Sequence, residues 1–367
     1  MATDNEGLFD AADYVRPALS GFEPYDPAFT PCKINLSANE NTHVMPPGFV
    51  EQLRCAATSV SLNRYPDPMA NELRNELALR HGVSRDMICV GNGGDELLFN
   101  LLFAFGGAGR TLVICPPDFA EYANFATMCD TPVVRIPRDP ETFAIDEDAL
   151  VKAASTAALV FLTSPNNPTG NLLEAGVLTR LLTETKALVL VDEAYVEFAA
   201  SDASFVSWLA EHPRLIILRT LSKAFGLAGL RVGYVLAHPS VINQLAAIRQ
   251  IYSVDVVAQA VALAAVQNRE LLAPVVADIV AERDRLANEL GEISGVRIWP
   301  SEANFVLVRL PDAARVRTRL RDEFSILVRD FSSTPGLEGC LRITVGTPEE
   351  NNHVIHALRD LSKEWSV

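Results

Sequence analysis

The strongest chemical signal in the sequence is one segment, TLSKAFGLAGLRVGY, at residues 220–234. The apolar residues 215–218 before it predict a buried strand, so Thr220, Ser222 and Lys223 follow that strand on a tight loop. A lysine amine forms an imine with a carbonyl compound once its pKa is lowered. The guanidinium of Arg231 offers a two-pronged contact to phosphate. The combination indicates a phosphate ester beside an imine-forming amine, although a lone loop lysine is usually a surface residue.

A second segment, LVLVDEAYVEF at residues 188–198, combines a carboxylate with a phenol. Asp192 follows four apolar residues, at the carboxyl end of a predicted strand, where open α/β sheets bind their ligands. A carboxylate there can keep a pyridine nitrogen protonated, which makes the ring an electron sink. Tyr195 can donate to a phenolate oxygen of the same ring. The alternative is that Asp192 only caps a helix, and this segment alone does not decide between the two.

Three weaker segments also follow predicted strands. SPNNPTGN at 164–171 places the amide of Asn167 at the sheet edge, and GNGGDELL at 91–98 predicts an anion-binding helix start. CPPDFAEY at 115–122 places Phe119 where it can stack on a flat ring. Each segment has an ordinary alternative, namely a plain loop, a chain reversal or core packing.

The elements that position these residues alternate regularly between strands and helices. Strands are predicted at 87–90, 111–115, 132–136, 159–162, 188–191, 215–218 and 232–236. Helical segments at 95–105, 120–128 and 174–184 separate several of them. This pattern predicts βαβ units around a mostly parallel central sheet flanked by helices.

A smaller α+β unit is predicted in the last third of the chain. A long helical stretch at about 256–290 precedes it, and strands at 305–309, 326–328 and 341–345 then alternate with helices at 313–322 and 348–361. The first thirty residues contain several prolines and are interpreted as an extended arm. We therefore expect an α/β fold with three parts: 1–46, the arm and a segment of the small domain; 47–270, the large domain; and 271–367, the small C-terminal domain.

Composition excludes several classes of protein. The 367 residues carry a formal charge of -15, which argues against nucleic acid as a partner. The N-terminus is acidic and lacks an apolar run, so no signal peptide is expected. No apolar stretch is long enough to predict a membrane span. The six scattered cysteines are expected to be buried reduced thiols in a cytoplasmic protein, and the histidine spacing predicts no metal site.

Taken in this order, the segments resemble the fold-type I pyridoxal-phosphate enzymes and, within them, the histidinol-phosphate aminotransferases. INLSANEN, NRYPDP, ILVRD and LRITVGT also match, and the resemblance extends from about residue 24 to the last helix. It implies bound pyridoxal 5'-phosphate, with Lys223 forming the Schiff base and Asp192 pairing with the pyridine nitrogen. Tyr195 and Asn167 would bond the phenolic oxygen, and Phe119 would stack on the ring. The resemblance assigns the phosphate to Gly94, Asp95, Thr220, Ser222 and Arg231.

The resemblance also implies a homodimer with shared active sites, in which Tyr65 reaches the phosphate bound by the other subunit. Asn39 and Tyr25 would contact the substrate, Tyr25 across the dimer. Arg342 would bind a substrate carboxylate, and Arg329 would bind the phosphate of histidinol phosphate. The sequence places these two arginines on neighbouring predicted strands, where they can face one cleft. The alternative for Arg329 is a surface ion pair with Asp330 or Glu323.

The implied reaction converts L-histidinol phosphate and 2-oxoglutarate into imidazole acetol phosphate and L-glutamate, in histidine biosynthesis. Three positions depart from the family pattern: Phe119 stands where Tyr is common, Gly94 where Ser or Ala is common, and Ile251 where Pro is usual. The last departure bears on the wall of the substrate pocket. The alternatives are an aromatic amino-acid aminotransferase, a decarboxylase or lyase resembling threonine-phosphate decarboxylase, and a non-enzymatic binding protein.

Overall fold

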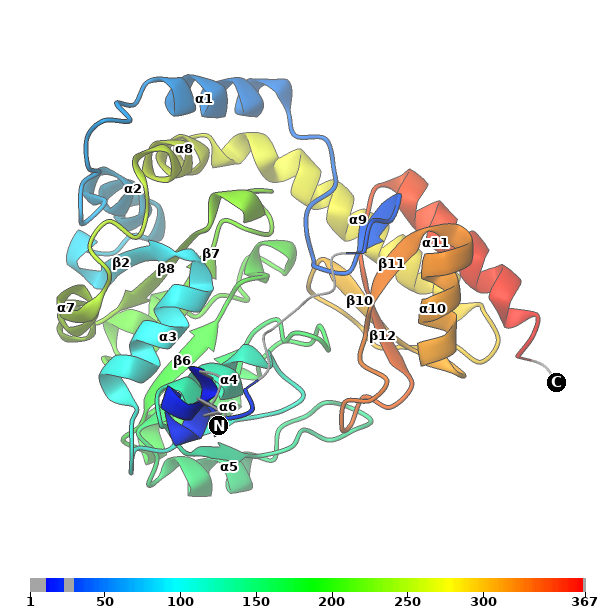
Figure 1. The fold of residues 1–367 in the computed structure, drawn as a ribbon, viewed down its shortest axis with the longest axis horizontal. Helices are drawn as coiled ribbons and strands as arrows, with labels where there is room; N and C mark the ends of the chain where they lie inside the picture. Colours follow the sequence, from blue (N-terminus) through cyan, green and yellow to red (C-terminus); the bar gives the residue numbers. More distant parts are fainter. Residues whose placement is uncertain (1–10, 23–29, 366–367) are drawn as a thin grey trace, which may run out of the picture.

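The structure is a computed structural model that describes residues 11–22 and 30–365. These residues form two sheets with helices packed around each (Figure 1). A seven-stranded sheet lies in the larger part of the molecule. A five-stranded sheet lies in the smaller part, and helix α9 runs between the two (Figure 1).

The large sheet has the strand order β2-β8-β7-β6-β5-β3-β4. Its strands are β2 Ile88–Asn92, β3 Leu112–Ile114, β4 Val133–Arg135, β5 Leu159–Thr163, β6 Leu188–Asp192, β7 Leu215–Thr220 and β8 Val232–Ala237. All seven predicted strands are confirmed, and the sheet is parallel except for β8, which runs antiparallel to both of its neighbours. Only a short loop joins β7 to β8, and a parallel pair would need a crossover of a dozen or more residues.

Helices cover both faces of this sheet because successive strand residues point to opposite sides. One face packs against α3 Gly93–Phe105, α4 Glu121–Met128 and α7 Pro239–Ile248. The other packs against α1 Pro47–Thr58, α2 Asn71–His81, α5 Glu147–Ala154, α6 Ala175–Glu184 and α8 Val256–Gln267. On β5, Leu159 and Phe161 enter the first core, and Val160 and Leu162 enter the second.

The small sheet has the order β1-β11-β12-β10-β9. Its elements are β1 Ile34–Leu36, β9 Arg297–Ile298, β10 Phe305–Arg309, β11 Ile326–Asp330 and β12 Cys340–Thr344, with α10 Ala313–Phe324 and α11 Pro348–Ser362. Strand β1 pairs in parallel with β11, so a segment near the start of the chain completes a sheet built from its end. The division of the chain at residues 46 and 270 stays a prediction.

The predicted long helical stretch at 256–290 is interrupted. Helix α8 ends at Gln267, a 3₁₀ helix η7 covers Arg269–Leu272, and α9 covers Ala273–Gly291. The two helical segments meet at 73°. Pro274 lies in the first turn of α9, where its missing N–H is tolerated; further inside a continuous helix it would break a hydrogen bond.

Within the described ranges, no single helix is long and apolar enough to cross a membrane. In the same part of the chain, α8 and the segment from Arg269 to Gly291 together reach that length and apolar composition, as a pair bent by 73°.

Two smaller expectations are wrong. Residues 11–19 are not extended, because they form two 3₁₀ turns, and Arg16 donates to the carbonyl of Met128 at 2.6 Å and pairs with Asp130. Cys89, Cys115 and Cys340 are buried thiols as expected, but Cys32 and Cys129 are half-buried and Cys55 is exposed on α1. The apolar face of α1 is narrow, and Phe49 is its buried residue.

Candidate active site

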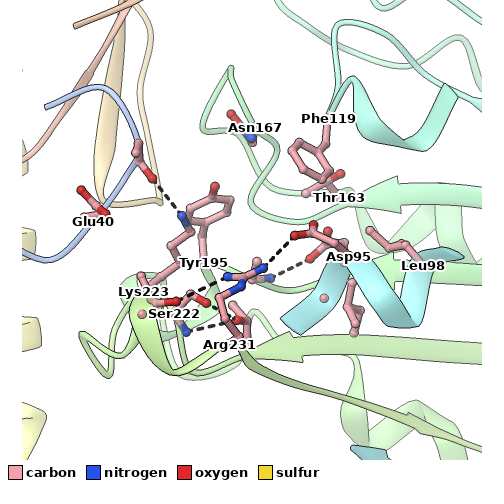
Figure 2. A pocket seen from close by; sticks show the side chains of 18 residues that line it. Glu40, Asp95, Leu98, Phe119, Thr163, Asn167, Tyr195, Ser222, Lys223 and Arg231 are labelled. Atoms are coloured by element: carbon pink, nitrogen blue, oxygen red, sulfur yellow. Dashed lines mark hydrogen bonds and ion pairs between the residues drawn. The ribbon is translucent and has the colours of Figure 1, made fainter. Parts of the chain in front are cut away.

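A cavity of about 400 Å³ lies at the carboxyl edge of the large sheet (Figure 2). Ten of the predicted site residues line it: Gly94, Asp95, Phe119, Asn167, Asp192, Tyr195, Thr220, Ser222, Lys223 and Arg231. They come from the ends of strands, such as Asp192 and Thr220, and from the loops and the helix start next to those ends. Because parallel strands end at the same edge, these distant segments converge there.

Strand register explains which side chains enter the cavity. Asp192 is aligned with Thr163 on β5 and with Leu218 on β7, and all three line the cavity. Thr220 lies two residues beyond Leu218 and lines it as well. Arg219, between them, faces the other side of the sheet, as the two-residue period of a strand requires.

Lys223 is half-buried at one wall of the cavity, and its Nζ donates to the carbonyl of Ala38 at 2.9 Å (Figure 2). Burial and, to a smaller extent, the positive charge of Arg342 together lower the pKa of this amine to about 8. The carboxylate of Glu40, on the same wall, acts in the opposite direction. The uncharged form, which attacks a carbonyl carbon, is therefore more populated near neutral pH than for an ordinary lysine.

Asp192 lies at the base of the cavity and is buried. Its Oδ2 accepts from the hydroxyl of Tyr122 at 2.8 Å, and its Oδ1 accepts from the backbone N–H of Ala194 at 3.0 Å. Burial raises the pKa of Asp192 to about 6, while the Tyr122 bond opposes that rise. A cation placed beside this carboxylate would favour its charged form.

Tyr122 is a site residue that the sequence analysis missed. It is fully buried, and its hydroxyl lies 2.9 Å from the hydroxyl of Thr163 as well as contacting Asp192. Phe119 packs edge-on against the Tyr122 ring, with centroids 5.5 Å apart. The available signal was the position of Tyr122 one helical turn after Phe119, on the first turn of α4.

At the opposite end of the cavity, donors gather around the first turn of α3. The hydroxyls of Thr220 and Ser222 are 3.0 Å apart, and Arg231 Nη2 bonds Asp95 Oδ2 at 2.8 Å (Figure 2). The backbone of Gly93 has φ +80°, and a Cβ there would lie 2.6 Å from Arg231 Nη2. Two hydroxyls, a guanidinium and a helix amino end form a suitable cradle for a phosphate group.

Residues on and next to the small sheet close the cavity with a network of amides and one guanidinium. Asn39 Nδ2 donates to the Tyr195 hydroxyl at 2.9 Å. The hydroxyl of Thr344 accepts from the backbone N–H of Asn39 and donates to Asn39 Oδ1. Arg342 donates to Asn167 Oδ1 at 2.5 Å and to the carbonyl of Ser37. Asn39 and Arg342 thus reach the site through contacts with Tyr195 and Asn167, residues that line it.

Two further predicted residues do not line this cavity, and a third lies outside the described residues. Tyr65 is 81% exposed and stacks on Tyr252 at 4.6 Å. Arg329 does not line the cavity. It lies directly opposite Arg342 in the β11–β12 register, so the two arginines are on neighbouring strands, as the sequence predicted. Tyr25 lies outside the described residues.

The departures from the family pattern can be placed as well. A Cβ at Gly94 would meet Leu218 at 3.5 Å, an ordinary contact, so the site has room for a small side chain there. Ile251 is exposed next to Tyr252 and is not among the residues that line the described cavity. Across residues 11–22 and 30–365, no group of three His, Cys, Asp or Glu side chains is arranged to hold a metal ion.

Comparison with known proteins agrees with this geometry. The profile of the class I and II aminotransferases matches residues 31–358. A histidinol-phosphate aminotransferase from a Thermoanaerobacter species is 38% identical over 350 residues, which cover 95% of this chain and 98% of the relative.

Two solved structures have the same fold. Histidinol-phosphate aminotransferase from Sinorhizobium meliloti, in complex with pyridoxal-5'-phosphate, aligns with a TM-score of 0.84 and 28% identity over 92% of each chain. L-threonine-O-3-phosphate decarboxylase from Porphyromonas gingivalis aligns with a TM-score of 0.79 and 27% identity, over 90% of this chain and 99% of its own. The resemblance predicted from the sequence is confirmed, and the chain belongs to the class I and II aminotransferase family.

Proposed function

We propose that this chain is a pyridoxal-phosphate-dependent transaminase that converts L-histidinol phosphate and 2-oxoglutarate into imidazole acetol phosphate and L-glutamate. One observation carries the proposal: a lysine whose pKa is lowered to about 8 shares a cavity with a buried carboxylate and a phosphate cradle. The names of the similar proteins from Thermoanaerobacter and Sinorhizobium meliloti support this choice of substrate.

The residues fit the cofactor at both of its ends. Thr220, Ser222 and Arg231 would hold the phosphate together with the first amides of α3, because the glycine at 93 lets the backbone approach closely. Asp192 would pair with the ring nitrogen, and Phe119 would cover the ring. Bound pyridoxal phosphate supplies an aldehyde for the lysine amine and a ring that delocalises the electrons released from the substrate.

The other residues act on protons and orientation. The Nζ of Lys223 can take up and return a proton near neutral pH, since its pKa is lowered to about 8. The amide of Asn39 donates to the Tyr195 oxygen, which leaves the phenolic hydrogen available for an oxygen of a bound ring. The hydroxyl of Tyr122 donates to Asp192 and thereby favours its ionised form.

The substrate end of the site would use the two arginines of the small sheet. Arg342 is held beside Asn167, and Arg329 lies across from it on β11. We assign Arg342 to a substrate carboxylate and Arg329 to the phosphate of histidinol phosphate. Because the two arginine side chains start from different strands, they would reach different parts of a substrate, and one site could then accept both substrates in turn.

Product analysis tests the proposal. Purified protein should be yellow, should bleach on adding L-histidinol phosphate, and should form L-glutamate when 2-oxoglutarate follows. Release of carbon dioxide from a phosphorylated amino acid would favour the lyase alternative, and faster turnover of aromatic amino acids would favour the aromatic aminotransferase. A colourless protein that binds no cofactor would support the non-enzymatic alternative.

We further propose a cytoplasmic homodimer with shared sites. Tyr65, Leu62 and Ile251 are large apolar side chains that one chain leaves exposed, as expected for residues that a partner covers. Variants that lack Lys223 or Tyr65 should partly complement each other when their subunits exchange, because one intact site forms in each mixed dimer. A fully active monomer by light scattering would contradict this proposal.

A further inference from the structure

A second cavity, of about 890 Å³, lies on the far side of the strand that leads to Lys223. It shares walls with the catalytic cavity at three places. Arg219 lines it immediately before Thr220, Ala224 and Phe225 line it immediately after Lys223, and Phe198 lines it three residues after Tyr195. A molecule packed against Ala224 and Phe225 therefore contacts the loop that carries the catalytic lysine.

The opposite wall is the bend between α8 and α9. Leu272 from η7 and Val276 and Val280 from α9 present an apolar surface, and Phe225 and Leu77 add to it from the large domain. Because α9 runs between the two sheets (Figure 1), an occupant that packs against both Val276 and Phe225 contacts the connection between the sheets as well as the lysine loop. An apolar body of aromatic size suits this surface.

One rim of the cavity carries two arginines that converge on one carboxylate oxygen. Arg80 Nη1 lies 3.4 Å from Glu270 Oε1, and Arg269 Nε lies 3.0 Å from the same atom. Arg80 is held in place by Glu76 at 2.8 Å and by the carbonyl of Gln267 at 3.0 Å. Within the described part of the chain, neither Nη atom of Arg269 has a hydrogen-bond acceptor.

Glu270 is a replaceable occupant of this rim. Its side chain is 71% exposed, and an exposed ion pair of this kind contributes only about 0–1 kcal/mol. The other two glutamates that line the cavity already face arginines inside it, Glu197 with Arg219 at 2.9 Å and Glu302 with Arg283 at 3.9 Å. A bidentate ligand carboxylate can therefore take the place of Glu270 between two guanidinium groups.

We propose that this second cavity is a regulatory site for a small monocarboxylate with an aromatic or branched apolar body. The carboxylate binds between Arg80 and Arg269, and the apolar body packs against α9 and Phe225. A bound molecule restrains both the lysine loop and the α8–α9 connection, so it lowers kcat without competing with substrate.

Calorimetric titration of the holoenzyme with indole-3-propionate tests the site, because this acid has neither an amino nor a keto group to react. We expect one molecule bound per chain. The Kd should rise at least tenfold when Arg80→Ala and Arg269→Ala are combined, since two charge-assisted contacts are lost. Glu270→Ala should lower the Kd severalfold, because it removes the competing carboxylate. The matched control Arg315→Ala, an exposed arginine on α10, should leave the Kd unchanged.

A second comparison separates the two cavities. Arg342→Ala should not change the Kd if the acid binds in the second cavity. If Arg342→Ala abolishes binding while the Arg80 and Arg269 variants retain it, the acid occupies the catalytic site and the proposal is wrong. It is equally wrong if the neutral indole-3-propanamide binds as tightly, or if no heat of binding is detected. These calorimetric results do not depend on which substrates the enzyme uses, so they stand even if the proposed reaction fails its own test.

Discussion

Asp192 and Glu193 are neighbours at the end of β6, yet their carboxylates lie on opposite faces of the sheet. Asp192 faces the catalytic cavity, where a phenol and a backbone amide are its hydrogen-bond donors. Glu193 is fully buried on the other face, where its oxygens accept from Arg219 at 2.8 Å, Ser204 at 2.9 Å and the backbone of Phe205. The same strand end thus holds one carboxylate with neutral donors and one paired with a cation.

The different partners of Asp192 and Glu193 suit one carboxylate to catalysis and the other to stabilising the fold. A buried carboxylate without a cation has a raised pKa, here about 6, and it is therefore ready to pair with a cationic ring nitrogen. A buried carboxylate that is paired and fully hydrogen-bonded contributes little chemistry, but losing its partner is costly. Substitutions on the cavity face should reduce catalysis, and substitutions on the far face should reduce stability.

The largest effect should come from Lys223→Ala on the cavity face. Turnover should fall by about 10⁴-fold or more, because no other amine in the cavity can take over its role. The fold should remain intact, since the apolar core does not use this side chain. Steady-state kinetics and a thermal melt measure the two effects, and an ordinary transamination rate would show that Lys223 has been misassigned.

Asp192→Asn should leave cofactor binding in place and lower kcat by about 10²–10⁴-fold, because an amide cannot stabilise a protonated ring nitrogen. The absorbance of bound cofactor and the rate of product formation measure these effects separately. A near-normal kcat would mean that Asp192 only caps the turn after β6.

Glu193→Gln is the matched substitution on the far face. It should cost about 1.5–3 kcal/mol in the free energy of unfolding, because a buried charged contact to Arg219 is lost while Glu197 still pairs with that guanidinium. The value of kcat should change only a few-fold. Denaturant unfolding measures the loss of stability. Unchanged stability together with lost activity would contradict the assignment of the far face to stability.

Arg329→Ala extends the comparison to the small sheet. Loss of a charged contact to a phosphate should cost about 1.5–3 kcal/mol, or roughly ten- to a hundredfold in kcat/KM for histidinol phosphate. Aromatic amino acids, which carry no phosphate, should lose much less. Equal and small losses for both substrates would place Arg329 in a surface pair and favour the aromatic aminotransferase.

The smallest effect concerns the titration of Lys223 in the cofactor-free protein. Its labelling by an amine reagent should reach half of the maximal rate near pH 8 rather than near 10.5. Arg342→Ala should move this midpoint upward, and Glu40→Gln should move it downward. Because the folded chain releases this proton at a lower pH than the unfolded chain, stability should also rise between about pH 8 and 10.5. A midpoint unaffected by either substitution would contradict the assigned causes of the shift.

Most of the catalytic cavity could be predicted because its residues obey a local rule. Asp192, Asn167 and Lys223 each follow a strand that the apolar pattern reveals, and the carboxyl ends of parallel strands meet at one edge. The family motifs then supplied the roles. The chain itself therefore determined the fold class, the strands of the large sheet and the residues at their ends, because each depends on short-range patterns and on a general property of βαβ units.

Only the tertiary structure decided the contacts between segments that no periodic pattern connects. These are the bond from Tyr122 to Asp192, the bond from Asn39 to Tyr195, and the pairing of β1 with β11. Pro274 is a local signal for a break near η7, but the 73° angle between α8 and α9, and with it the second cavity, depends on packing. The angle between α8 and α9 is set because the two helices pack against different sheets. Such contacts depend on how distant elements fit together in space, and the order of residues along one element carries no information about that fit.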